Sequence, residues 1–144
     1  MDGLLLLTRI AGRPAAFRAC DIRSIIEIGE ITPVPRAPDY VAGLAALRSR
    51  ALTVIDSRAA LGVSEPASTP DERAPVVEVD GHAYALLVDR VDDVVSGIGQ
   101  PTPAAATLGP DWTRVAQGMI ETTAGPATLV DVVALISGPR RAAA

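Results

Sequence analysis

The sequence contains an internal repeat in which equivalent residues lie 75 positions apart, without a gap. Gly43 corresponds to Gly118, and the segment 53–56 corresponds to the segment 128–131. Further upstream the spacing changes to 69, and the matching residues are Ile22, Ile25 and Ile26 with Val91, Val94 and Val95. A short insertion within residues 97–110 accounts for the change in spacing. Such self-similarity indicates two similar structural units produced by duplication.

The residue pattern in both halves is typical of short β-strands. Residues 4–19 predict a hairpin across a glycine-containing turn, and residues 76–88 predict a second hairpin whose turn is Asp80-Gly81. Asp-Gly is a strong hairpin signal because a type I′ turn needs positive φ at both central positions. An extended apolar segment then continues from residue 91 to Gly97.

Helices are predicted to be few and short. The segments 56–61 and 131–136 each follow a strand directly, and each begins with an Asp that is placed to cap the first turn. Gly62 and Gly138 stand where these two helices are expected to end.

These patterns predict one all-β domain over residues 1–144. It consists of two repeat subdomains, about 15–75 and 76–138, which are joined through the polar segment 64–73. Small closed barrels suit such units because closure removes exposed sheet edges. Each unit alone would be marginally stable, so we expect the two to share a core. A groove between packed units is a natural binding place for a partner.

The composition excludes several classes of function. With one Cys, an internal disulfide is impossible, and the net charge of −4 argues against nucleic-acid binding. All 13 basic residues are Arg, so chemistry that needs a lysine is impossible. No apolar run is long enough to span a bilayer, and the N-terminus lacks the basic flank of a signal peptide. We therefore expect a cytoplasmic protein that does not insert into membranes.

No group of side chains forms a catalytic or metal-binding pattern. His82 is the single histidine, and without a second His it is interpreted as a solvated turn residue. Cys20 has no catalytic signature around it. The acids between residues 80 and 93 do not have EF-hand spacing, and a solvated face explains them better. The segment 95–99 leads into prolines and cannot open a phosphate-binding helix. We predict no enzyme activity, no cofactor and no metal.

Five local patterns occur together in the order and spacing of one family. They are IRSIIEI with ITPVP (22–35), PDYVAGLAALR (38–48), LTVIDSRAALG (52–62), LLVDRVDDV (86–94) and LVD (129–131). With these patterns the chain resembles the CheW family of bacterial chemotaxis adaptors over nearly its whole length. The resemblance implies two intertwined five-stranded SH3-like barrels with short helices, with strand exchange at the N-terminus.

The resemblance also implies a function. CheW adaptors bridge the cytoplasmic tips of methyl-accepting chemoreceptors to the regulatory domain of the histidine kinase CheA, and they need no cofactor. Such a protein would be cytoplasmic and recruited to membrane receptor arrays. The alternative is a CheW-like regulatory module that binds only one of these partners, in a chemotaxis-like pathway with another output.

Family receptor-contact positions carry over to Ile25, Glu27, Arg48 and Val94. Kinase contact in the family uses apolar patches on the two barrels, and Val41 and Leu44, just before the Arg48 turn, are the candidate kinase-binding residues. The sequence departs from the family pattern at Ser49 and Thr53, where a Gly and a Pro are usual. Ser at a turn position that favours positive φ costs on the order of 1 kcal/mol relative to Gly. These departures are consistent with a divergent paralogue.

Overall fold

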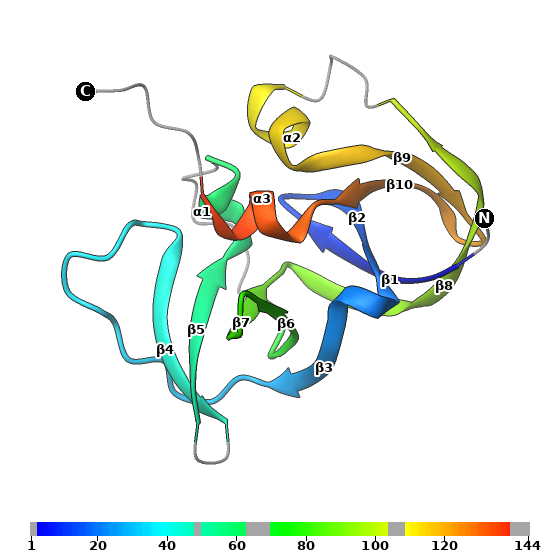
Figure 1. Ribbon diagram of the computed structural model, residues 1–144. Coiled ribbons are helices and arrows are strands. Elements are labelled where there is room, and N and C mark those ends of the chain that lie inside the picture. The colour runs from blue at the N-terminus through cyan, green and yellow to red at the C-terminus, as the bar shows by residue number, and fades with distance from the viewer. Residues whose placement is uncertain (1–2, 48–49, 63–69, 104–108, 139–144) are drawn as a thin grey trace.

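The computed structural model describes residues 3–47, 50–62, 70–103 and 109–138, and its described part is built mainly from β-strands (Figure 1). The first half contains β1 (Leu4–Ile10), β2 (Arg13–Arg18), the 3₁₀ turn η1 (Ala19–Asp21), β3 (Ile22–Glu27), β4 (Val41–Leu47), β5 (Arg50–Asp56) and α1 (Ser57–Ala60). The second half contains β6 (Arg73–Val79), β7 (His82–Leu87), β8 (Arg90–Thr102), α2 (Pro110–Val115), β9 (Ala116–Thr122), β10 (Gly125–Val130) and α3 (Val132–Ile136). The predicted all-β class with short helices is confirmed.

The strands form two five-stranded sheets. The first is a closed barrel with the order β1-β2-β10-β9-β8, on the right of Figure 1. The second, which we call the open sheet, has the order β3-β6-β7-β5-β4. An isolated bridge joins Leu44 of β4 to Thr32, in the segment that follows β3, and the amides and carbonyls of the two residues are paired at 2.8 Å in both directions.

The two halves of the chain exchange strands reciprocally. β1 and β2 come from the first half but pair with β8, β9 and β10 in the closed barrel. β6 and β7 come from the second half but pair with β3, β4 and β5 in the open sheet. Parallel contacts join the exchanged strands, with β2 beside β10 and β7 beside β5. Neither sheet is therefore complete without strands from both halves.

The predicted units of about 15–75 and 76–138, with strand exchange at the N-terminus, follow the repeat along the sequence, whereas the two sheets group the strands in space. The open sheet spans residues 22–87, and the closed barrel takes residues 4–18 and 90–130. The physical reason is that β1 and β6 are buried on both faces along most of their length. A strand with two buried faces contributes to the interior of its own sheet and also to the contact between the sheets.

The hydrophobic core has three parts, which follow the alternation of side chains along the strands. On β1, Leu5 and Leu7 fill the closed barrel, whereas Leu6 and Ile10 point into a core between the sheets. That shared core contains Phe17, Trp112 and residues from both sheets and all three helices, while a separate cluster fills the open sheet. The expectation that the two units share a core is confirmed.

Polar contacts also join the two sheets near the helices. The Arg114 guanidinium of α2 donates to the carbonyl of Ala60 at 2.8 Å and to that of Ala134 at 2.6 Å. Since Ala60 and Ala134 lie in α1 and α3, one side chain satisfies carbonyls of both helices. Arg58 and Asp89 form a largely buried ion pair at 3.2 Å. The hydrogen bonds of Arg114 and the ion pair between Arg58 and Asp89 hold the two halves of the chain in one arrangement.

Candidate functional site

Ile25 and Val94, which the sequence predicts as receptor contacts, occupy equivalent positions in the two sheets. Ile25 on β3 lies opposite Pro75 on β6, and Val94 on β8 lies opposite Leu6 on β1. Pro75 and Leu6 are buried, whereas Ile25 is 42% exposed and Val94 is 51% exposed. At this equivalent position each sheet therefore has an exposed apolar side chain opposite a buried residue of the neighbouring strand.

Glu27 lies on the same face of β3 as Ile25. Ile26, between them, packs against the core of the open sheet, so its neighbours point outward. Glu27 is exposed, and its partner across the β3–β6 ladder is Arg73. Arg48, which the sequence predicts as a receptor contact and a possible partner of Glu27, lies outside the described residues.

Two side chains at the start of β6 hold the backbone at the start of β8. Asp71 Oδ2 accepts a hydrogen bond from the Val91 amide at 2.8 Å, and Arg73 Nη2 donates to the Val91 carbonyl at 3.0 Å. The same Arg73 nitrogen lies 3.5 Å from Asp71 Oδ2. Because β6 and β8 belong to different sheets, these contacts cross the seam between the sheets. We call Asp71, Arg73 and the Val91 backbone the seam clip.

The surroundings of Asp71 favour its ionised form. Burial acts to raise the pKa of Asp71, but the Val91 and Arg73 amides and the Arg73 guanidinium outweigh it. Together they hold the pKa of Asp71 below its ordinary value of 3.8. At neutral pH the seam clip is therefore a charged pair, with the Asp71 side chain 15% exposed and that of Arg73 51% exposed.

Val41 and Leu44, which the sequence predicts as kinase contacts, both lie on β4 but have different surroundings. Val41 is partly buried and packs against the shared core. Leu44 is 39% exposed, and its backbone is bridged to Thr32. Val34, two residues beyond Thr32, is 38% exposed. Of the two predicted residues, Leu44 is the one that presents an apolar surface to a partner.

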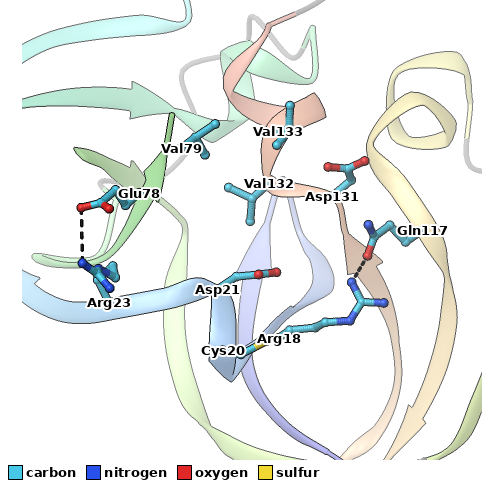
Figure 2. A pocket seen from close by; sticks show the side chains of 10 residues that line it. All are labelled: Arg18, Cys20, Asp21, Arg23, Glu78, Val79, Gln117, Asp131, Val132 and Val133. Carbon is cyan, nitrogen blue, oxygen red and sulfur yellow. Dashed lines mark hydrogen bonds and ion pairs between the residues drawn. The ribbon is translucent and has the colours of Figure 1, made fainter. Parts of the chain in front are cut away.

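A pocket of about 420 Å³ opens between the two sheets (Figure 2). Its lining is mostly polar and consists of Arg18, Cys20, Asp21, Arg23, Glu78, Val79, Gln117, Asp131, Val132 and Val133. Arg18 donates to Gln117, and Arg23 forms an ion pair with Glu78 at 3.4 Å. Most of the charged groups are thus engaged with a neighbour. Among the predicted contact residues that the structure describes, Ile25, Glu27, Val94, Val41 and Leu44 do not line this pocket.

Sequence reasoning missed the seam clip. Asp71 and Val91 are 20 residues apart. Val91 belongs to the repeat and to the pattern at 86–94, but Asp71 lies in the connecting segment and belongs to neither. The observation that would have pointed to the clip is the pairing of β6 with β3, which places Arg73 opposite Glu27. That pairing is a property of the fold and not of local sequence.

Among the described residues, titratable side chains do not form a recognisable reaction centre. No three His, Cys, Asp or Glu side chains in this part of the chain are grouped so that they could hold a metal ion. His82 is exposed at the start of β7, and Cys20 is an exposed free thiol. None of the described helices has the length and hydrophobicity needed to cross a membrane.

Comparisons with known proteins agree on one family. A family model described as "CheW-like domain" matches residues 4–140. The chemotaxis protein CheW of Rhizobium meliloti is 29% identical over 144 residues, which cover 97% of this chain and 91% of that protein. The probable chemotaxis protein CheW of Rhizobium etli is 29% identical over 140 residues, which cover 94% and 88%. The crystal structure of scaffolding protein TtCheW from Thermoanaerobacter tengcongensis superposes with a TM-score of 0.76, at 22% identity, over 90% of this chain and 84% of that one.

Proposed function

The chain belongs to the CheW family and is a coupling adaptor of chemotaxis, and we propose that it joins the cytoplasmic tip of a methyl-accepting chemoreceptor to the regulatory domain of the histidine kinase CheA. It works through binding geometry alone, without catalysis and without a cofactor. It is cytoplasmic, and the receptor recruits it to membrane arrays. It neither binds nucleic acid nor inserts into the membrane.

The observation that supports the receptor part of this proposal is the pair of exposed apolar residues, Ile25 and Val94. They occupy equivalent positions on β3 and β8, and each lies opposite a buried residue of the neighbouring strand. A helix that docks on a protein surface uses apolar anchors with charges at their margin. Glu27, on the same face as Ile25, supplies such a charge, and Arg48 is proposed as a second one.

The kinase part of the proposal rests on β4 of the open sheet. Leu44 presents an exposed apolar side chain there, and Val41 supports the same strand from the shared core. β4 is a different strand from β3 and β8, which carry Ile25 and Val94, and we expect both partners to bind at once. Simultaneous binding is what distinguishes an adaptor from the alternative, a module that binds only one partner.

The experiment that tests the proposal is a comparison of Val94→Asp with the matched control Val133→Asp. Val133 lies on α3 and is 55% exposed, close to the 51% of Val94. An anchor that becomes buried on binding carries much of the affinity, so Val94→Asp is expected to weaken receptor binding by about tenfold or more. The kinase affinity and the thermal unfolding midpoint of Val94→Asp should stay unchanged. The control Val133→Asp should bind both the receptor and the kinase as the wild type does.

A second arm of the experiment tests the charges. Arg48→Glu is expected to weaken receptor binding measurably, because charges at the margin of an interface act mainly on specificity. If Glu27 and Arg48 pair directly, the double reversal Glu27→Arg with Arg48→Glu should recover part of the loss.

Unchanged receptor affinity in a correctly folded Val94→Asp variant would place the receptor site elsewhere. Binding of only one partner by the wild-type chain would favour the alternative module.

A further inference from the structure

We propose that Asp71 and Arg73 are positioning residues of the receptor site, because the seam clip sets the place of β8, and hence of Val94, relative to β3. This inference rests on the proposed function. Neither residue needs to touch the receptor. Their role is to fix the spacing of the two surfaces that the receptor helix would contact.

The first argument is the geometry at the start of β8. Both polar groups of the Val91 backbone are bonded to the clip, the amide to Asp71 and the carbonyl to Arg73. On its other side Val91 lies opposite Thr8 of β1, while β9 pairs with β8 only from Gly97 onward. The clip thus takes the place of a partner strand at this point. The clip therefore holds β8 at Val91, three residues before Val94.

The second argument is that the other end of the clip lies on the strand that supports Ile25. In the β3–β6 ladder, Arg73 is opposite Glu27, and Pro75 is opposite Ile25. The same β6 segment therefore positions Ile25 and Glu27 through the ladder and Val94 through the clip. The amide of Asp71 adds a further bond, at 3.0 Å, to the carbonyl of Val88, just before β8.

The third argument is that the clip is not a general requirement of the fold. β1 is the strand equivalent to β6, and Leu4 occupies the position that corresponds to Arg73. In the corresponding ladder, Leu4 lies opposite Ser96, the counterpart of Glu27. The closed barrel is thus built without an Arg at this place. A charged pair that only one half of a duplicated fold keeps is not required for forming the sheet itself, so we assign it a role at the binding surface in addition to any contribution to stability.

The test compares receptor and kinase affinities of Arg73→Leu, Arg73→Lys and the matched control Arg23→Leu. Arg73→Leu installs the residue found at the equivalent position of the other half. Arg23 lies on the open sheet as well, with a side chain that is 64% exposed and paired with Glu78. If the clip positions β8, Arg73→Leu should weaken receptor binding by about fivefold, and Arg73→Lys, which keeps a donor, by less than about twofold. Kinase affinity should stay unchanged in all three variants, and a loss of receptor affinity without a loss of kinase affinity separates positioning from a general loss of stability.

Two outcomes would overturn the inference. If Arg73→Leu leaves receptor affinity unchanged while Val94→Asp lowers it, the receptor site is correct but the clip does not position it. If Arg73→Leu lowers receptor affinity, kinase affinity and the unfolding midpoint together, the role of the clip is structural only. Unchanged receptor affinity in Val94→Asp would count against the proposed receptor site itself, which separates the two hypotheses.

Discussion

Gly43 and Gly118 are equivalent residues of the repeat, and both allow a close approach of two backbone segments. Their φ angles are +148° and +137°, which side chains rarely tolerate. A Cβ atom at Gly43 would lie 2.3 Å from the Thr32 carbonyl oxygen, and one at Gly118 would lie 2.5 Å from that of Thr102. At Gly43 the close contact is between β4 and the segment that follows β3, and at Gly118 it is between β9 and the end of β8. The absence of a side chain at these two positions is therefore what permits the two backbone segments to meet.

Replacing either glycine should strongly destabilise the protein. Gly43→Ala and Gly118→Ala are each expected to lower the free energy of unfolding by about 2–4 kcal/mol, because backbone strain and overpacking add. Urea unfolding followed by circular dichroism measures this change. Gly29→Ala is the control, since no atom lies within 4 Å of its position, and it should change stability by less than about 0.5 kcal/mol. Equal effects of Gly29→Ala and Gly43→Ala would contradict the close-approach explanation.

Asp71 makes a pH-dependent contribution to stability. Its pKa is lowered in the folded protein, so its ionised form stabilises the fold above the ordinary pKa of 3.8. That stabilisation is lost as the pH falls through the lower pKa of the native state. The difference in unfolding free energy between wild type and Asp71→Asn should therefore be constant from about pH 7 to about pH 5 and shrink below about pH 4. A difference that persists undiminished at about pH 2 would contradict this assignment.

At the scale of elements, the repeat preserves a complete strand–cap–helix unit. The Asp56 amide donates to the Tyr40 carbonyl at 2.8 Å, and the Asp131 amide donates to the Val115 carbonyl at 2.7 Å. Both Asp side chains then cap the helix that follows, as the sequence predicts. α1 ends at Ala60 and α3 at Ile136, each two residues before a glycine with positive φ, 75° at Gly62 and 76° at Gly138. Duplication has thus conserved local geometry as well as residue type.

The two capping Asp residues are expected to contribute unequally to the free energy of unfolding. Oδ1 of Asp56 accepts bonds from the amides of Arg58 and Ala59, whereas Asp131 accepts one from Ala134. Asp56→Ala and Asp131→Ala should each cost about 0.5–2 kcal/mol of unfolding free energy, with the larger loss at Asp56. Thermal and urea unfolding check this.

Asp39→Ala is the matched control for the caps, because Asp39 is exposed in the loop before β4. It should change stability by no more than about 0.5 kcal/mol. Cap variants that are as stable as this control would show that helix packing alone holds α1 and α3 in place.

At the scale of the whole molecule, reciprocal exchange makes the two halves mutually dependent. The closed barrel needs β1 and β2 from the first half, and the open sheet needs β6 and β7 from the second. The shared core, which lies between the sheets, collects side chains from both. The proposed receptor-binding surfaces on β3 and β8 are consequently held in a fixed relative position, which suits an adaptor that must keep two partners in a defined geometry.

Fragments of the chain provide a test of this dependence. A cut in the connecting segment yields residues 1–66 and 67–144, each with strands from both sheets but with neither sheet complete. Neither fragment should fold alone, because each would leave its part of the shared core exposed to water. An equimolar mixture should recover the circular dichroism spectrum and cooperative unfolding of the intact chain. Cooperative unfolding of residues 67–144 alone would contradict the prediction.

Much of this protein could be predicted from its sequence, because the relevant signals are local or periodic. The hairpin at Asp80-Gly81, the two capping Asp residues and the repeat depend on neighbours within a few positions or on a constant spacing. These features identify the strands, the short helices and the family resemblance. They also place Ile25 and Val94 at equivalent positions, although their role as receptor contacts stays a prediction.

Only the tertiary structure decided which strands pair, where the chain divides and what holds the seam. β6 is apolar on both faces, and its sequence does not reveal which sheet it will join. The pairing follows from burial of both faces at once, in the open sheet and in the shared core. The seam clip joins Asp71 to a backbone amide 20 residues away, and backbone groups carry no sequence signal. Long-range pairing depends on the free energy of the assembled core, which no segment of the sequence contains by itself.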